Sequence, residues 1–415
     1  MTQRALIFAA FFFSAAAWSR SAEQQAVPWT RWDLATGDWN RNRPLLEEEG
    51  LKFIATYTSQ TWGNVTGGTQ RGATYSGVLQ FGTEIDLGQL VGWEGASFNT
   101  TWLWIYGGNA TTSLTGGLFP SSGIEAPNGL RALDLWLQQK LFREVLTLRA
   151  GLFNADRDFT ISQGAQLFLN SGFGWPLLYD GQLGGPPAYP FAAPGVYAAL
   201  EPGGGWKFQA AAMQGEAWPP GQNPTGFYWR LDPGTGFLFL GEAQYAWDRA
   251  PSPGAVKLGA ILGTGEDDNV KGTGTSWGSS FLYGILDQML WREPGASDTP
   301  PQGLALFNRT MFTGTPASQT IGMLFNAGFT WTGPFEGRDQ DAAGLALLWT
   351  RLTPDEAAQL GGTNRGHEFV IEATYELQLT PWFEVQPDLQ FIIQPGGSTA
   401  LANALVIGLS ATIDF

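Results

Sequence analysis

The chain of 415 residues contains no cysteine and a single histidine, His367. Without cysteine there can be no disulfide framework, no zinc–thiolate site and no thiol nucleophile. No serine elbow and no metal-spaced cluster accompanies His367, which we interpret as a surface residue at the edge of a strand. We therefore expect no enzymatic activity and no cofactor.

Charge is also scarce. Asp, Glu, Lys and Arg make up 14% of the residues, against about 25% in typical soluble proteins. The formal net charge is −15, and an acidic surface cannot release counterions from phosphates, so nucleic acid is excluded as a partner. A soluble protein with so little charge and 19 tryptophans would tend to aggregate, which favours a membrane location.

Long hydrophobic runs are missing as well. Residues 5–17 form one apolar run behind the basic Arg4, and small residues follow it, which is the pattern of a secretory signal. This run is too short for a transmembrane helix, and no later segment is apolar for the roughly 18 residues that mark one. We predict a signal peptide at residues 1–22 (cleavage between 17 and 26), a short periplasmic tether at 23–36 and a barrel at 37–415. A buried helix of the mature fold is the alternative for residues 5–17.

What the chain has instead is glycine (56 residues), aromatic side chains (14%) and regular alternation. Residues 368–379, 383–394 and 405–415 each alternate apolar and polar side chains, so that each run has one apolar and one polar face as a strand. Each run has the length that a tilted strand needs to cross a bilayer. Pro387 falls on the predicted lipid face, and we interpret it as a bulge.

Similar runs continue upstream and bring the total to about 16 strands. They lie at residues 50–64, 75–87, 96–107, 131–140, 146–153, 195–202, 206–214, 236–247, 254–264, 278–291, 303–313, 321–332 and 342–351. An even number near 16 is typical of outer-membrane barrels that enclose an aqueous channel. We predict an all-β fold, a transmembrane antiparallel β-barrel with a polar, water-filled interior.

The longest connection follows the fifth strand and runs from Asn154 to about Pro194. A connection of about 40 residues in a compact fold is usually functional or disordered. Residues 159–169 read as a short helix, and we predict that the loop folds inward and narrows the channel; an ordered external flap is the alternative. Its candidate constriction residues are Asp156, Arg157, Asp158, Gln163, Asn170 and Trp175.

Short motifs across residues 37–415 resemble the carbohydrate-selective porins, the OprB-like family of outer-membrane barrels. The most specific block is FLNSGFGWP at 168–176; the others are GDW at 37–39, GWEG at 92–95, EAP at 125–127, LR at 130–131, LW at 135–136, YP at 189–190, APG at 193–195, LTPW at 379–382, QPD at 386–388 and PGG at 395–397. The resemblance implies passive, sugar-favouring diffusion through a barrel of about 16 strands in the outer membrane of a Gram-negative bacterium. Its partners would be small sugars, outer-membrane lipid and the assembly machinery that reads the C-terminal Phe415, with a homo-oligomer left open.

A sugar pore needs polar groups on its inner wall, because its selectivity depends on its width and on the donors, acceptors and charges that line it. Trp136 could offer a flat face to a sugar, and Arg131 and Arg149 could present rigid donor groups. An inward carboxylate, however, is more often a solvated wall residue, and Trp175 is more often a loop anchor. The candidate pore-lining and solute-binding residues are Glu84, Asp86, Arg131, Asp134, Trp136, Arg149, Glu372, Glu376 and Asp388.

Two other functions remain in competition at this point. The net charge of −15 would also suit a general or cation-favouring porin without sugar preference, because an acidic lumen concentrates cations. A soluble secreted β-protein such as a lectin would have to bury many unpaired carboxylates, at several kcal/mol each. We therefore reject a soluble secreted protein and keep the general or cation-favouring porin as the alternative.

Overall fold

The computed structural model describes residues 27–175, 187–217, 223–227, 229, 231, 235–248, 252–295, 301–363 and 365–415. The predicted signal peptide, its cleavage region and the first residues of the predicted tether lie outside these ranges. The boundaries proposed for these segments therefore stay predictions.

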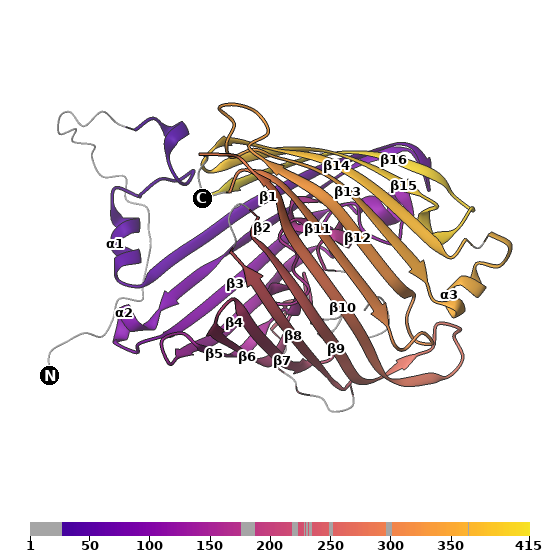
Figure 1. Cartoon of the computed structure of the whole chain (residues 1–415), viewed down its shortest axis with the longest axis horizontal. Helices are drawn as coiled ribbons and strands as arrows, with labels where there is room; N and C mark the ends of the chain where they lie inside the picture. The colour runs from indigo at the N-terminus through magenta and orange to yellow at the C-terminus, as the bar shows by residue number, and fades with distance from the viewer. Residues whose placement is uncertain are drawn as a thin grey trace.

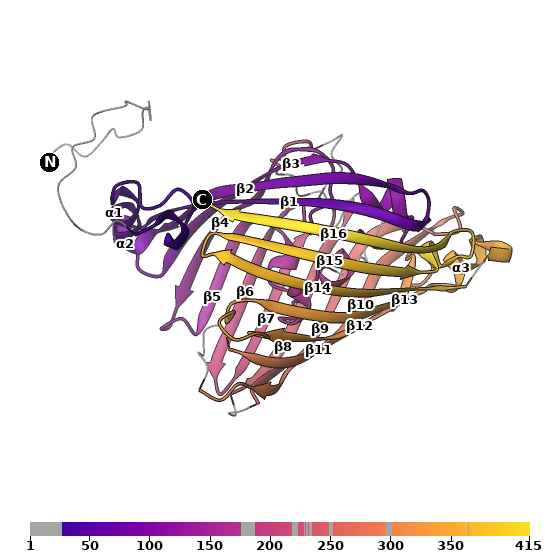
Figure 2. The same ribbon diagram turned by 90° about the horizontal axis from the view of Figure 1, so that it is seen from above.

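Sixteen strands in the described residues form one closed barrel, in which each strand pairs antiparallel with its neighbours in sequence and β1 pairs with β16 (Figures 1 and 2). They are β1 (Leu51–Gly68), β2 (Gly72–Asp86), β3 (Ala96–Gly107), β4 (Gly129–Leu141), β5 (Leu146–Phe153), β6 (Ala193–Gly203), β7 (Trp206–Gln214), β8 (Phe237–Trp247), β9 (Gly254–Asp268), β10 (Thr275–Arg292), β11 (Gly303–Thr313), β12 (Ile321–Thr332), β13 (Ala342–Leu352), β14 (His367–Thr380), β15 (Phe383–Ile393) and β16 (Ala402–Asp414). The predicted sixteen-stranded antiparallel barrel is confirmed, and every predicted run overlaps one of these strands.

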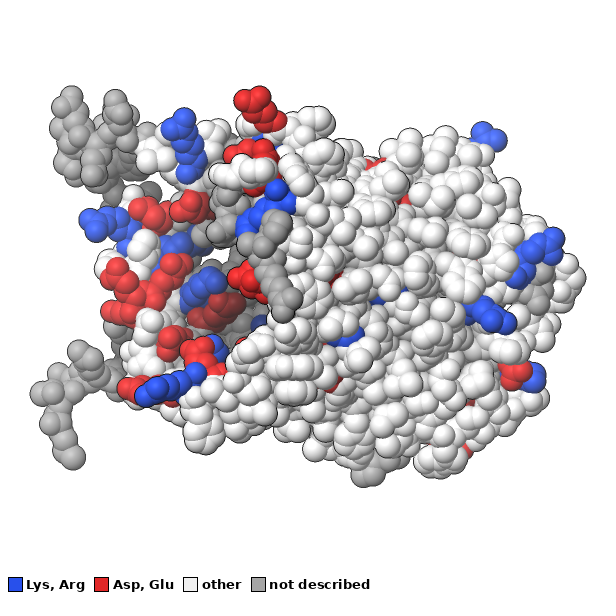
Figure 3. Space-filling view, viewed as in Figure 1, with Lys and Arg blue, Asp and Glu red and all other residues white. Residues whose placement is uncertain are grey.

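The outer face of the wall is apolar. Large side chains such as Leu258, Leu282 and Ile407 are exposed on it, and acidic and basic residues gather toward the two ends, leaving a broad, largely uncharged band between them (Figure 3). Exposed apolar side chains in such a band are what a membrane-spanning barrel presents to lipid.

Pro387 does not form the predicted bulge. It is exposed on β15, as expected for the lipid face. The pairs Thr374↔Asp388 and Leu377↔Val385 keep one register on either side of it, so no extra residue is inserted. A proline removes one ladder N–H, and the regular pairing of the neighbouring residues is enough to hold the register.

Part of the interior is an apolar core, which the prediction of a polar lumen did not include. Val370, Ile392 and Val406 alternate along their strands with exposed outward residues and are themselves buried inside the barrel. They belong to a cluster that includes buried phenylalanines from the β3–β4 and β5–β6 connections, namely Phe119, Phe159, Phe168 and Phe173. Each such burial contributes about 1.5–3 kcal/mol. Two connections are therefore held inside the barrel largely by apolar packing.

Short helices border the barrel at both ends. The α1 (Asn42–Glu48) and α2 (Leu87–Val91) helices lie at the end that carries the C-terminus, and α3 (Pro354–Gln359) lies at the opposite end (Figure 1). Asp86 begins α2 by accepting the N–H groups of Gly88 (2.8 Å) and Gln89 (3.1 Å). Of the helices that the structure describes, none has the length and hydrophobicity to cross a bilayer.

A substitution at Gly408, at the seam between β1 and β16, tests how tightly the side chains pack on the inner face of the wall. A Cβ atom there would lie 2.3 Å from Cζ3 of the fully buried Trp62 ring. We expect Gly408→Val to destabilise the barrel by about 1–3 kcal/mol through overpacking, measured as a lower temperature of the heat-induced mobility shift in detergent gels. The control is Ile407→Val on the exposed lipid face next to it, and an equal loss in both variants would contradict the explanation.

Candidate functional site

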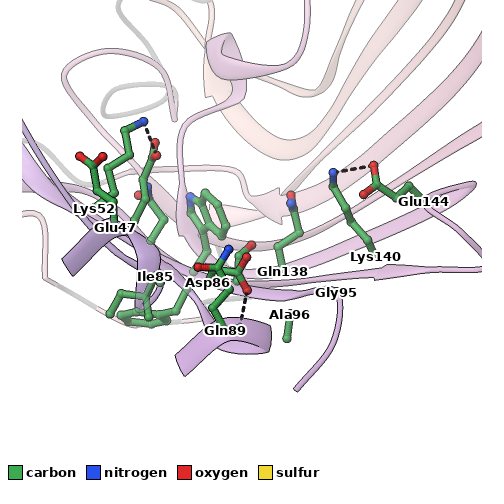
Figure 4. Close-up of a pocket in the computed structure, with 16 residues that line it drawn as sticks. Glu47, Lys52, Ile85, Asp86, Gln89, Gly95, Ala96, Gln138, Lys140 and Glu144 are labelled. Carbon is green, nitrogen blue, oxygen red and sulfur yellow. Dashed lines mark hydrogen bonds and ion pairs between the residues drawn. The ribbon is translucent and has the colours of Figure 1, made fainter. Parts of the chain in front are cut away.

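The barrel end that carries α1 and α2 contains a polar cavity of about 570 Å³, which we call the vestibule (Figure 4). Two ion pairs line opposite sides of it: Lys52 Nζ lies 2.9 Å from Glu84 Oε2, and Lys140 Nζ lies 2.9 Å from Glu144 Oε2. Glu84 therefore lies in the vestibule wall with its charge paired. Asp86 borders the same cavity, but its Oδ1 is engaged in capping α2.

A cluster of charged and aromatic side chains lies at the inner end of the vestibule; we call it the Trp136 cluster. Arg149 donates to both carboxylate oxygens of Asp158 (2.6 and 3.3 Å), and Arg157 donates to Asp134 Oδ2 (2.8 Å). The Trp136 indole donates to Asp134 Oδ1 (3.2 Å). The guanidinium carbons of Arg149 and Arg157 lie 4.9 and 5.0 Å from the centre of the Trp136 ring. Two cation–π contacts of about 0.5–2 kcal/mol each hold both arginines over this ring.

Arg131 reaches the interior because of a β-bulge. A register shift between β3 and β4 leaves Leu133 as an extra residue, and an extra residue reverses the alternation of the side chains before it. Arg131 thereby points to the same side of the wall as Asp134. It is buried, donates to Pro127 O (3.3 Å) and lies 5.0 Å from the centre of the Phe191 ring. Its surroundings are thus loop residues, not the vestibule.

The connection after β5 enters the barrel as a series of short turns (Figure 2). They are 3₁₀ turns at Ala155–Arg157, Ala165–Leu167 and Ser171–Phe173, so the predicted helix over residues 159–169 is wrong. Thr160 has a φ of +62°, which ends any helix there. Several N–H groups of this segment are bound instead by the barrel wall.

Wall carboxylates accept hydrogen bonds from backbone N–H groups of this connection. Glu242 accepts from Thr160 N (3.3 Å), and Asp287 accepts from Gly164 N (3.2 Å). Glu372 accepts from both Leu169 N (2.6 Å) and Asn170 N (3.1 Å). Charge-assisted bonds of this kind are about twice as strong as neutral ones. Glu372, a predicted pore-lining residue, is fully buried and serves as one of these anchors.

Two wall cations bind the carbonyl groups of the same connection. Arg309 donates to the carbonyls of Thr160 (2.9 Å), Gly172 (2.8 Å) and Gly174 (2.6 Å), and Lys257 donates to that of Ile161 (2.6 Å). Arg309 thus joins the outgoing and returning parts of the connection. Neither cation was among the residues predicted from the sequence, although a lone basic residue on the inward side of a strand was a usable signal.

A second inward connection, residues 108–128 between β3 and β4, was also missed. Glu368 binds the N–H groups of Leu118 (2.9 Å) and Gly396 (2.7 Å), and Pro120 O accepts the N–H of Ser171 (2.9 Å). The two inward connections are therefore bound to the wall and to each other. The signal in the sequence was the pair of large apolar residues at 118–119 in a segment otherwise rich in Gly, Ser and Thr.

Residues 70–415 match the sequence profile of the family described as carbohydrate-selective porin, OprB family. The chain belongs to the OprB family. Porin B of Pseudomonas aeruginosa is 25% identical over 451 aligned positions, which cover 94% of this chain and 92% of that protein. The high-pH structure of Pseudomonas putida OprB superposes with a TM-score of 0.84 at 22% identity and covers 93% of this chain and 99% of that one; the low-pH structure gives 0.61 at 18% identity. Family and barrel together place this porin in the outer membrane of a Gram-negative bacterium.

The remaining predicted loop and wall residues of this porin differ in their surroundings. Asp388 accepts from Gln390 Nε2 (3.0 Å), and Asn170 Nδ2 donates to Gln390 Oε1 (3.1 Å), so both are tied into the wall–loop contact. Trp175 packs partly buried against the apolar core. Gln163, by contrast, is exposed, and it lies on the part of the inward connection that solvent reaches.

The docking of the inward connections of this porin is expected to depend on pH. Burial raises the pKa of Asp156 to about 7, and in the other connection it raises that of Glu125 to about 7. The pKa of a carboxyl group in an unfolded chain is near 4. The protonated carboxyls therefore stabilise the docked connections fully below about pH 4, and this stabilisation is lost as the pH rises through about 7. Single-channel current noise should therefore be lower at pH 5 than at pH 8.

The double variant Asp156→Asn/Glu125→Gln keeps both groups neutral at every pH. It should remove most of the difference in noise between the two conditions. A pH dependence that persists in this variant would assign the effect to other groups.

Proposed function

We propose that this porin lets carbohydrates and other small hydrophilic solutes diffuse passively across the outer membrane along a water-filled path beside the inward connections, which narrow it. The observation that carries the proposal is the vestibule, a polar cavity that extends from the barrel end inward to Trp136. Arg157 and Gln163 are exposed beyond it on the β5–β6 connection. Polar side chains therefore border the proposed path in the vestibule and on the β5–β6 connection.

The paired charges suit a neutral solute. A sugar crosses a narrow polar path by exchanging hydration for hydrogen bonds with the wall. In the Trp136 cluster each carboxylate is bonded to an arginine, so the groups offer donors and acceptors with little net charge. The Trp136 ring itself lies against two guanidinium groups and is buried. We therefore assign it the role of positioning Arg149 and Arg157, in place of the sugar-stacking role that the sequence suggested.

Transport is the whole of the proposed activity. Membership in the OprB family implies a channel. We assign no catalytic step to it. The single histidine, His367, lies at the start of β14, where its ring packs edge-on against that of Phe369 with 5.4 Å between the ring centres.

Liposome swelling tests the sugar preference. Reconstituted porin should admit monosaccharides and disaccharides faster than non-sugar neutral solutes of equal size. Equal rates for all neutral solutes of one size would leave a general pore and remove the sugar preference.

A general or cation-favouring pore is the second candidate, and one observation favours it. The vestibule is lined by four carboxylates but only two lysines, namely Glu47, Glu84, Asp86 and Glu144 against Lys52 and Lys140. Glu376 on β14 and Glu384 on β15 add two half-buried carboxylates. Such a surplus attracts cations. Reversal potentials in a salt gradient measure this preference for cations separately from the rates of sugar entry.

The sidedness and partners complete the proposal. We place the end with α1 and α2 toward the periplasm, with outer-membrane lipid around the band of Figure 3. The C-terminal Phe415, whose N–H donates to Ala55 O (2.9 Å) in the finished barrel, is proposed as the residue that the assembly machinery reads. A homo-oligomer stays open.

A further inference from the structure

The described part of the predicted tether is folded against the barrel. Residues 27–43, which we call the collar, run beside the end of the wall where the chain terminates (Figure 1). The ring of Trp29 lies 4.3 Å from that of Trp382 in the β14–β15 turn, and Ala35 N donates to Asp414 O (2.8 Å). Arg43 Nη2 donates to Phe415 O (2.9 Å). The collar is thus attached to the last strand and to the turn before β15.

The tryptophans of the collar have their N–H groups satisfied within the collar itself. Trp29 Nε1 donates to Ala35 O (3.0 Å), and Trp32 Nε1 donates to Val27 O (3.1 Å). Trp39 Nε1 donates to the hydroxyl of Thr36 (3.3 Å). A buried indole normally seeks a polar partner, and here the need is already met. These rings can leave water without leaving an unpaired donor.

The same three rings remain exposed. Trp29 is 53% exposed, and Trp32 and Trp39 are each 37% exposed. Three large aromatic side chains within eleven residues, all open to the surroundings, are unusual on a surface that faces only water.

The collar is continuous with the lipid-facing surface of the barrel. Lys52 lines the vestibule, so its neighbour Phe53 points outward, and the Trp39 ring lies 5.8 Å from that of Phe53. On the other side of the seam, the Trp382 ring stacks on that of Phe383 with 5.9 Å between their centres, and the Trp29 ring packs at a tilt against Trp382. Two series of aromatic rings, one on each side of the seam, therefore lead from the outer wall onto the collar.

We propose that the collar binds phospholipid, lying in the headgroup region of the membrane leaflet next to it. Tryptophan is enriched at membrane–water interfaces because one part of its ring system is apolar and the other polar. The ring pairs at Phe53 and Trp382 place the collar at the level where the apolar outer wall ends. Residues 27–36, the described part of the predicted short periplasmic tether, thus form an interfacial anchor together with residues 37–43, and this role does not depend on which solutes the porin passes.

Single nitroxide labels test the depth of the collar, and the chain suits them because it has no cysteine of its own. The label is attached to Trp32→Cys in the full-length porin reconstituted in phospholipid vesicles. Two matched references are Ile407→Cys on the exposed lipid-facing wall and Glu144→Cys in the turn between β4 and β5. The measurement is the ratio of collision rates with oxygen, which dissolves in lipid, and with a water-soluble nickel chelate.

The proposal predicts a ratio at position 32 several-fold above that at position 144 and closer to that at position 407. A ratio equal to that at position 144 would place the collar in water and overturn the proposal. A label shielded from both reagents would mean that protein, such as a second copy of this chain, covers the collar, which would also overturn it. Heat-modified mobility in detergent gels confirms that each labelled variant is folded before it is scored.

Discussion

Arg309→Met is expected to make the single-channel current unsteady and to weaken discrimination among sugars while the barrel stays folded. Arg309 is the buried residue that joins Thr160 to Gly172 and Gly174 through three carbonyl bonds. Methionine fills a similar volume but donates nothing. Asn326 still binds Gly172 O (3.0 Å) in the variant. The carbonyls of Thr160 and Gly174 lose this donor, and the loss at the buried Thr160 carbonyl costs about 1–3 kcal/mol of docking free energy.

This loss falls on the docking of the inward connection and not on the strand ladder, because the backbone pairing of β11 with β10 and β12 is unaffected. Current noise should rise several-fold, and the temperature of barrel unfolding should change less. Arg351→Met, an exposed arginine on β13, is the matched control and should behave as the wild type. Steady current with unchanged sugar rates in Arg309→Met would show that Arg309 does not position the path.

Arg149→Met should lower the free energy of unfolding by about 3–5 kcal/mol, because it leaves the largely buried carboxylate of Asp158 without its partner. The side chains of Arg149 and Asp158 are only 7% and 12% exposed, and two hydrogen bonds join them. The same change removes the cation from between three rings, which are those of Trp136, Phe153 and Tyr197. The expected result is a lower unfolding temperature together with faster, less selective solute entry.

A double-mutant cycle separates the ion pair from the ring contacts. Arg149→Met/Asp158→Leu removes both charges and should recover much of the stability lost in the single variant, since a buried ion pair is often replaceable by apolar side chains. Solute selectivity should not return with it, because the donor groups of Arg149 over Trp136 are still missing. If selectivity returns together with stability, the arginine acts only through the fold.

The wall of the barrel could be predicted from the sequence because one local rule governs it. Side chains alternate between two environments along each strand, so the runs at residues 96–107, 146–153, 206–214, 303–313 and 321–332 coincide with β3, β5, β7, β11 and β12. The alternation fails where an extra residue is inserted into a strand. The extra residue Leu133 brings Arg131 inside against its parity, and Pro387 disturbs nothing, because its neighbours hold the register.

The interior could not be predicted in the same way. Inward apolar residues such as Val370 and Ile392 read as exceptions to a polar face, but they are the contact surface for loop phenylalanines far away in sequence. Inward carboxylates such as Glu372 read as solute contacts, but they bind loop N–H groups. Both outcomes depend on which connection folds inward, and this is set by tertiary packing.

On the proposed path, solutes pass along the exposed side of the β5–β6 connection. The most direct test introduces Gln163→Cys, an exposed position on that connection, and follows single-channel conductance during treatment with a bulky, charged, membrane-impermeant thiol reagent. We expect a stable drop in conductance, which a permeating sugar slows, and no drop in Ile407→Cys on the lipid face. Reaction at position 163 without any change in conductance would contradict it.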